Sequence, residues 1–193
     1  LFRRILAYRR KITNIPLNFL TKSFLTSMLY RVGLRRFSME KLKTFNPATN
    51  ELLAELEIAS DQAIEEMVRK SHEAQKTWGA KSVEERARII VKAYEGVKTQ
   101  KQELADLIHR EMGKTQAESM SEVEAYSGGI ENMAAEVIEA LKPTARTAGE
   151  TTTTTYHDPL GVCASITPWN FPMGMPHTLM MPSLMAGNTV LFK

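Results

Sequence analysis

The stretch Gly161–Lys193, with the sequence GVCASITPWNFPMGMPHTLMMPSLMAGNTVLFK, decides the fold of this chain. It contains a short apolar run at residues 162–167, an apolar helical stretch at residues 175–185 and a second apolar run at residues 189–192. The helical stretch is expected to bend or restart at Pro182, because proline removes a helix hydrogen bond. Strand, helix and strand within 33 residues match the ~30 residues of a βαβ unit, which predicts an α/β fold with a buried parallel sheet. Many α/β folds contain such a unit, so it identifies no function by itself.

The residues upstream of this unit carry the pattern of a helical layer. Apolar side chains recur at helical spacing between residues 60 and 141. The signals that bound the helices are an N-cap at Ser60, a capping box formed by Ser82 and Glu85, and stops at Gly79 and Gly113. The last stretch, residues 116–141, contains Gly128-Gly129, where a kink or a close packing contact is expected. These stripes are interpreted as packing faces, and we assign no site to them.

Two extended segments flank the helical layer. Residues 44–58 predict two short extended pieces around a turn that begins at Asn46-Pro47. Residues 151–155 are five threonines, which favour a strand over a helix, and they lie between the breakers Lys142-Pro143 and Asp158-Pro159. Two interpretations of the threonine run are equally open: a polar strand that pairs with another sheet, such as another subunit's, or a solvated linker.

The composition is that of a globular protein, but the charge is uneven. Apolar residues make up 43% and charged residues 24% of the chain. The single cysteine, Cys163, excludes an internal disulfide and indicates a reducing compartment. Residues 1–38 carry nine of the 25 bases and no acid, whereas the remainder carries 16 bases and all 22 acids, a net charge of −6. The basic character therefore belongs to the leading segment, and no nucleic-acid partner is expected for the rest.

Residues 1–38 form a basic leader that is not expected to be part of the fold. Their acid-free, arginine-rich composition is typical of a mitochondrial transit peptide, and Arg35-Arg36-Phe37-Ser38 resembles the site at which such peptides are cut. Over-extended upstream translation is an equally open interpretation, because Met39 stands where the body of the protein begins. A membrane-surface helix is a third. No stable membrane span is expected, because Lys22 interrupts an apolar stretch already shorter than the ~20 residues that a span needs.

A loop suited to chemistry follows the first strand of the βαβ unit. Thr167-Pro168-Trp169-Asn170-Phe171-Pro172 begins at the carboxyl end of a parallel strand, the edge at which open α/β sheets bind ligands. Two prolines stiffen its backbone, and none of its side chains titrates near neutral pH. Asn170 therefore offers a rigid, uncharged amide that can stabilise a developing oxyanion without reorganisation. The alternative is that Asn170 is only a turn residue between prolines.

Several short motifs occur along residues 44–193. They are Asn46-Pro47-Ala48-Thr49, Glu111-Met112-Gly113-Lys114 at the end of the third helix, Pro159-Leu160-Gly161-Val162, Pro168-Trp169-Asn170-Phe171-Pro172, and Gly187-Asn188-Thr189-Val190 followed by Lys193. Together they resemble the aldehyde dehydrogenase superfamily over the whole body of the chain. The most specific part of this resemblance is the five-residue loop Pro168–Pro172 followed by Lys193, at the sequence distance that the family shows. It implies a Rossmann-like parallel sheet with a helical layer, truncated, plus an oligomerisation strand.

The resemblance assigns roles to six residues. Asn170 would donate its side-chain amide to the oxyanion of a thiohemiacetal, and Lys193 would hydrogen-bond the adenosine ribose of NAD or NADP. The other residues expected along the cofactor are Ile166, Thr167, Pro168 and Trp169. The alternative for Lys193 is a solvated lysine at a strand end. No residue is assigned to a metal.

Three further features receive no catalytic role. Cys163 is interpreted as a small buried hydrophobic residue within a strand. His177 could face the cofactor or the substrate, but it is interpreted as a polar residue at a helix start. The methionines between residues 173 and 185 are expected to line the core and a channel, and not to bind a metal.

The resemblance also divides the chain into parts. They are a basic leader at residues 1–38, an N-terminal hairpin and helical layer at 39–141, an extended oligomerisation strand at 142–160, and the first βαβ unit of the cofactor-binding domain at 161–193. The nucleophilic cysteine and the general-base glutamate are expected beyond Lys193, so that this chain alone would be inactive and would leave strand edges unpaired.

The function implied is that of an NAD(P)-dependent aldehyde dehydrogenase, which oxidises an aldehyde to its carboxylic acid. The chain looks most like the branch that oxidises semialdehydes, such as succinate semialdehyde. At full length we expect a homo-oligomer located in the cytoplasm or the mitochondrial matrix. The alternative from another class is a non-catalytic helical interaction module with a threonine-rich stalk.

Overall fold

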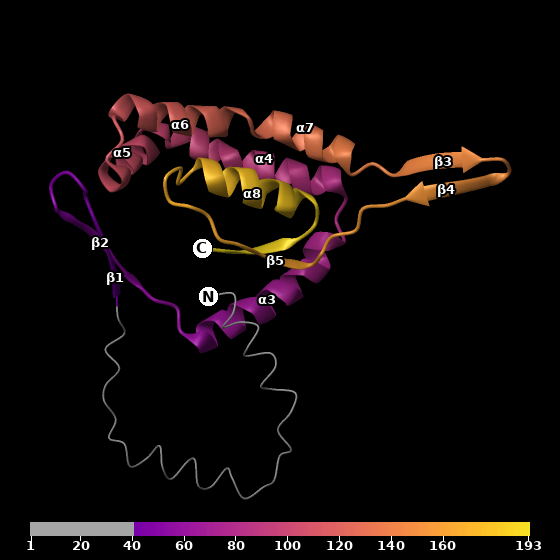
Figure 1. Ribbon diagram of the computed structural model, residues 1–193, viewed down its shortest axis with the longest axis horizontal. Coiled ribbons are helices and arrows are strands. Elements are labelled where there is room, and N and C mark those ends of the chain that lie inside the picture. The colour runs from indigo at the N-terminus through magenta and orange to yellow at the C-terminus, as the bar shows by residue number, and fades with distance from the viewer. Residues whose placement is uncertain (1–40) are drawn as a thin grey trace, which may run out of the picture. The chain divides into compact units, whose positions relative to one another are not determined.

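The structure is a computed structural model that describes residues 41–193, so the basic leader expected at residues 1–38 lies outside the described part. The elements and their bounds are β1 (Lys41–Phe45), β2 (Leu52–Glu57), α3 (Asp61–Gly79), α4 (Val83–Thr99), α5 (Lys101–Met112), α6 (Gln116–Gly128), α7 (Ile130–Ala140), β3 (Thr144–Ala148), β4 (Thr151–Thr155), β5 (Val162–Ser165), α8 (Gly174–Met185) and β6 (Thr189–Phe192). Figure 1 shows their arrangement.

The predicted turn at Asn46-Pro47 is confirmed as the connection of an antiparallel hairpin, β1–β2. The side-chain oxygen of Asn46 accepts hydrogen bonds from the backbone N–H groups of Ala48 and Thr49, at 2.9 and 3.3 Å. Asparagine thus holds the turn through its own side chain, as expected of this residue before a proline.

The helix boundaries follow the capping residues. Ser60 caps α3, and Ser82 with Glu85 forms a complete capping box at the start of α4. Helix α5 ends at Gly113, whose φ of 70° lies in the left-handed region that glycine adopts without strain. The helical stretch predicted over residues 116–141 is divided by Gly128-Gly129 into two helices, α6 and α7. The expected kink is therefore a complete break.

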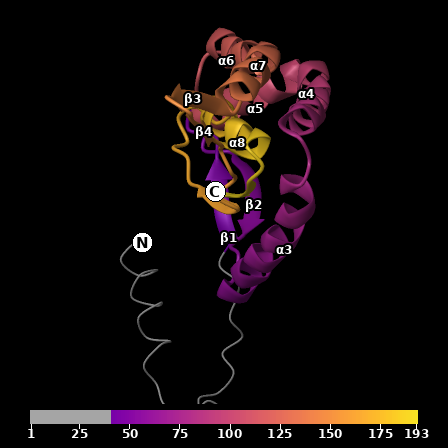
Figure 2. The ribbon, with the colours of Figure 1, turned by 90° about the vertical axis from the view of Figure 1, so that its right-hand side faces the viewer.

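The core lies where α8 packs onto the helical layer. Figure 2 shows α8 below α6 and α7 and beside α4. The buried residues of the main cluster are Ala87, Ile90 and Tyr94 from α4, Ile130 and Ala134 from α7, and Met185 from α8. A smaller cluster between α5 and α6 contains Ala105, Ile108 and Val123. Helix α8 is thus held by apolar contacts with helices that lie far from it in the sequence.

A buried arginine joins α4 to the end of α8. The Arg86 Nε–H donates to the carbonyl oxygen of Met185 at 2.7 Å, and the Nη1–H groups donate to the carbonyl oxygens of Lys81 and of Gly79. Burial lowers the pKa of Arg86. Because the last carbonyls of a helix lack partners within that helix, the guanidinium stabilises the C-terminal end of α8.

The predicted βαβ unit is confirmed, and its sheet positions the candidate site. Strands β5 and β6 pair in parallel, with Val162 opposite Thr189 and Ser165 opposite Phe192. Helix α8 is one helix that includes Pro182, so the restart that was one of the two outcomes expected there does not occur. Helix α3 packs against both strands, and α8 also contacts both. The two strands were expected to be buried, but both are partly exposed. Within residues 41–193 each of them pairs only with the other, so the outer edge of each strand is uncovered.

The threonine run forms a strand, so the linker interpretation is wrong, and its partner is a neighbouring segment of the same chain and not a separate sheet. Strand β4 pairs antiparallel with β3 of the same chain, and the connection contains Gly149 at a φ of 61°. Residues 142–160 therefore contain a hairpin and not a single extended strand. All ten strand residues are exposed, and the hairpin projects from the helical layer (Figure 1). None of the helices within residues 41–193 has the length and apolarity needed to cross a bilayer.

Candidate functional site

The carboxyl ends of β5 and β6 bring most of the predicted site residues together. Backbone pairing continues past both strands, because the Thr167 N–H donates to the Lys193 carbonyl oxygen at 3.0 Å, and the Lys193 N–H donates to the Ser165 carbonyl oxygen at 2.9 Å. Ile166 and Thr167 therefore lie beside Lys193, although 25 residues lie between Thr167 and Lys193 in the sequence. Such an edge is where α/β sheets bind ligands.

The loop that follows presents its side chains to solvent. Ile166 is 58% exposed and Trp169 is 78% exposed, and Pro168, Asn170 and Lys193 are also exposed. The Asn170 amide is thus not packed into the protein interior, and a ligand at this edge could reach it. The aromatic ring of Trp169, the amide of Asn170 and the ammonium group of Lys193 thus all belong to exposed residues that follow the strand ends.

The downstream end of the loop is held by a buried carboxylate that the sequence did not single out. Glu122 of α6 accepts hydrogen bonds from the backbone N–H groups of Met173 and Gly174, at 3.0 and 3.1 Å. Its side chain is only 3% exposed. In the sequence Glu122 looks like one more charged helix residue, and its contacts depend on chain segments about 50 residues away.

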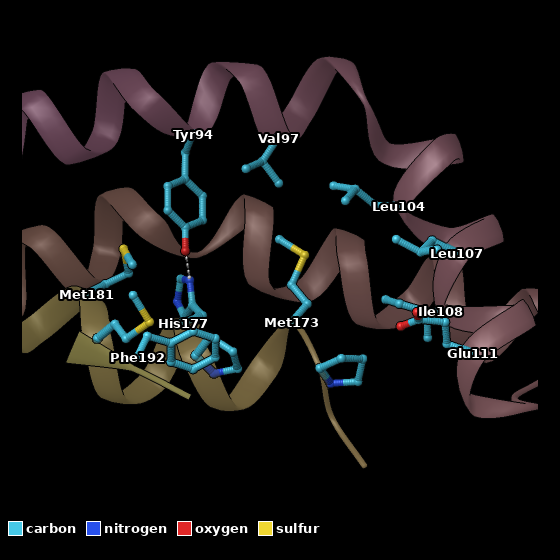
Figure 3. A pocket seen from close by; sticks show the side chains of 13 residues that line it. Tyr94, Val97, Leu104, Leu107, Ile108, Glu111, Met173, His177, Met181 and Phe192 are labelled. Atoms are coloured by element: carbon cyan, nitrogen blue, oxygen red, sulfur yellow. Dashed lines mark hydrogen bonds between the residues drawn. The ribbon is translucent and has the colours of Figure 1, made fainter. Parts of the chain in front are cut away.

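A cavity of about 410 Å³ lies beside the loop, between α4, α5, α8 and the end of β6. Its lining is mostly apolar, and the residues that form it are Tyr94, Val97, Leu104, Leu107, Ile108, Glu111, Pro172, Met173, Pro176, His177, Met180, Met181 and Phe192 (Figure 3). Three of the methionines expected to line a channel are among them. Phe192 directly precedes Lys193, so the cavity adjoins the strand edge.

The lining of the cavity contains one pair of hydrogen-bonded polar side chains. Figure 3 shows Tyr94 and His177 pointing toward one another, with 2.7 Å between the Tyr94 Oη and the His177 Nδ1. Burial raises the pKa of Tyr94 to about 12 and lowers the pKa of His177. His177 was expected to be a polar residue at a helix start, but it is buried, because the helix face that carries it packs on α4. The pair is therefore neutral near pH 7.

Cys163 lies in β5, upstream of the loop, as a partly buried free thiol. Nothing in its position conflicts with the interpretation of a small residue packed within a strand. Among residues 41–193, no three His, Cys, Asp or Glu side chains gather where they could hold a metal ion.

A sequence profile of the aldehyde dehydrogenase family matches residues 35–193. The chain belongs to this family. Both the family and the α/β fold predicted from the sequence are thereby confirmed. The match covers the hairpin, the helical layer and the βαβ unit, which are the parts that carry the loop and the strand edge.

Individual relatives support the assignment. The chain is 31% identical over 163 residues to D-glyceraldehyde dehydrogenase (NADP(+)) of Picrophilus torridus, a match that covers 81% of this chain and 32% of the relative. Its structure is similar to that of an aldehyde dehydrogenase from Brucella melitensis, with 31% identity, a TM-score of 0.74, and coverage of 79% of this chain and 32% of that one. An NADP-dependent enzyme of E. coli gives 27% identity and a TM-score of 0.74, with the same coverage. The chain thus spans about a third of the length of these relatives.

Proposed function

We propose that the protein is an NAD(P)-dependent aldehyde dehydrogenase that oxidises an aldehyde, with a semialdehyde as the favoured class, to the carboxylic acid. In this proposal residues 161–193 form the first βαβ unit of the cofactor-binding domain. The proposal assigns the nucleophilic cysteine and the general-base glutamate to parts of the enzyme other than these 193 residues, and the chain covers 32% of the length of the Picrophilus relative. Family membership and the accessible edge at Thr167 and Lys193 support the proposal.

The exposed amide of Asn170 carries the proposal. It lies on a loop that has its upstream end fixed by the Thr167–Lys193 backbone bond and its downstream end fixed by Glu122. When a thiolate attacks the aldehyde carbon, the carbonyl oxygen becomes negative, and a preorganised amide donor stabilises that charge. An asparagine keeps this donor at any physiological pH, because its side chain does not titrate.

The strand edge fits a dinucleotide in its chemistry. The Lys193 ammonium can donate to ribose hydroxyls, and Ile166, Thr167, Pro168 and Trp169 provide backbone groups and a ring edge along which the cofactor would lie. NAD or NADP supplies the hydride acceptor when it is bound. The name of the Picrophilus relative specifies NADP, which makes NADP a natural first choice of cofactor in assays.

We also propose a homo-oligomer that uses the β3–β4 hairpin. Its ten strand residues are exposed, and β4 pairs on one side only within the described chain, so its other edge offers free backbone donors and acceptors. The net charge of −6 on residues 39–193 disfavours a nucleic-acid partner. A reducing compartment, the cytoplasm or the mitochondrial matrix, suits a protein with one free thiol in this chain.

The test is the variant Asn170→Ala in the full-length protein. We expect kcat to fall by ~10²–10³-fold, with cofactor affinity and folding retained, because one oxyanion donor is lost. Lys193→Ala should weaken dinucleotide binding and keep most of the turnover at saturating cofactor. Failure of the wild-type protein to form NAD(P)H from any aldehyde would favour the non-catalytic interaction module. Loss of folding in Asn170→Ala would make that asparagine structural.

A further inference from the structure

Helix α8 begins without a cap of its own. Its N-cap residue is Met173, which has no side-chain hydrogen bond to the helix. The first N–H groups of a helix lack partners within it and carry partial positive charge. Here the carboxylate of Glu122, which comes from α6, accepts the N–H groups of both Met173 and Gly174. A distant acid therefore performs the capping role that Ser82 performs locally in α4.

The same carboxylate is paired with a lysine. Lys114 Nζ lies 2.6 Å from the second oxygen of Glu122, and the two side chains are 19% and 3% exposed. A charge buried to this degree is costly unless it is paired and hydrogen-bonded. Both carboxylate oxygens of Glu122 are occupied, one by two backbone amides and one by Lys114. The orientation of the carboxylate is thereby fixed.

Lys114 also contacts the residue next to Asn170. Its Nζ lies 4.0 Å from the centre of the Phe171 ring, within the range of a cation–π interaction. Lys114 directly follows Gly113, whose left-handed conformation ends α5. The motif Glu111-Met112-Gly113-Lys114, which received no role from the sequence, thus places an ammonium group between Glu122 and the loop.

The loop is consequently fixed on both sides of Asn170. Upstream, the Thr167 N–H is bound to the Lys193 carbonyl oxygen at 3.0 Å. Downstream, Phe171 contacts Lys114, and Met173 is bound to Glu122. Three residues, Pro168, Trp169 and Asn170, remain between these attachments, and the proline ring restricts the first of them.

We propose that the Lys114–Glu122 pair positions the Asn170 amide for catalysis. The inference rests on the function proposed above, and it adds two positioning residues that do not touch the reacting atoms. An oxyanion donor is effective only if it is held close to its productive geometry, and a displacement of ~1 Å can lower a rate by ~10²-fold. If the downstream attachment is lost, the Asn170 side chain samples other positions while the strand edge that receives the cofactor is unchanged.

The experiment compares variants of the full-length protein. Glu122→Ala removes the cap, and Glu122→Gln keeps an acceptor for the two amides but loses the charge. The double variant Lys114→Met with Glu122→Gln removes both charges and leaves no buried carboxylate unpaired. It should therefore fold even if a single variant does not, which keeps the proposal testable. The matched control is Lys98→Met with Glu131→Gln, an ion pair that has the same 2.6 Å separation but is exposed and lies between α4 and α7.

Two readouts are needed. Amide hydrogen exchange should accelerate by about 10- to 100-fold at Met173 and Gly174 in Glu122→Ala, the effect of losing a hydrogen bond to a charged group, while the amides of α4 keep their protection. In kinetic assays kcat should fall by ~10- to 100-fold while the KM for NAD(P) stays unchanged. The fall in kcat should be larger for Glu122→Ala than for Glu122→Gln. The control variant should match wild type in both.

The outcomes separate the two proposals. Local acceleration of exchange with an unchanged kcat would overturn the positioning role, as would uniform acceleration throughout the helices, which would make the pair structural. A rise in the KM for NAD(P) without a fall in kcat would also overturn it. An inactive wild-type protein would instead overturn the proposed function, and the exchange data would then report on the attachment of the loop alone.

Discussion

Gly174 begins α8 where the ring of Tyr126 passes against the helix. A Cβ atom at position 174 would lie 2.6 Å from Cε2, 2.7 Å from Cζ and 2.9 Å from Oη of that ring. Side-chain carbons do not approach this closely in folded proteins, and a ring wedged between α6 and α8 cannot move as the end of a flexible side chain can. We therefore predict that Gly174→Ala destabilises the protein by forcing the two helices apart.

The magnitude follows from two opposed effects. Overpacking of a well-packed site costs about 1–3 kcal/mol. Alanine regains up to ~1 kcal/mol relative to glycine inside a helix, and less at the first helical position. The net loss should be about 1–2 kcal/mol. Gly96→Ala in α4 is the matched control, because nothing lies within 4 Å of the Cβ it would add. That substitution should stabilise the protein by ~0.5–1 kcal/mol.

The assay is urea unfolding followed by far-UV circular dichroism. The two variants should differ by about 1.5–3 kcal/mol at equal m-values, since neither changes the surface exposed on unfolding. Tyr126→Ala removes the ring, so in that background Gly174→Ala should no longer be destabilising. A Gly174→Ala protein as stable as the wild type would refute the steric argument. An equal loss in the Tyr126→Ala background would do so as well.

Two further predictions concern buried polar groups. Arg86→Lys should lower the free energy of unfolding by ~2–4 kcal/mol. The reason is that an ammonium group cannot reach all three carbonyl oxygens, and each carbonyl oxygen left unpaired costs ~1–3 kcal/mol. A urea midpoint equal to that of the wild type would contradict this. Burial lowers the pKa of His177, so as pH falls below ~6.5 the unfolded state binds protons first and stability declines. His177→Asn should flatten that decline in unfolding experiments between pH 7.5 and pH 5, and identical pH profiles would argue against it.

The local signals in the sequence predicted most element boundaries. Capping residues such as Ser60 and Ser82 and the stop at Gly113 act within one helical turn, so their effect can be inferred from neighbouring residues alone. The same holds for the βαβ unit, in which two apolar runs flank a helix. The prediction of the loop at the carboxyl end of β5 succeeded for this reason.

The sequence did not predict contacts that depend on distant segments. The threonine run was expected to pair with another sheet, such as another subunit's, or to remain a linker. Its partner within the hairpin was missed because residues 144–148 mix small, charged and polar side chains and give no clear strand pattern. Glu122 was not singled out, and His177 was interpreted as a polar residue at a helix start and not as a buried one, since their partners lie 51 and 83 residues away. A glutamate within a helix usually indicates a face exposed to solvent. The burial of Glu122 depends on how the helices pack, which the sequence alone does not show.

Helix α8 is fastened at its first residues by Glu122 and at its last carbonyl by Arg86. Each residue of a helix adds 1.5 Å of length and about 100° of rotation. Removing or adding one residue between these attachments would turn one end of the helix relative to the other, so that either the loop or the start of β6 would lose its place. Sequence change within α8 should therefore proceed by exchange of side chains at constant length, whereas the exposed connection at Gly149 can vary in length without such a constraint.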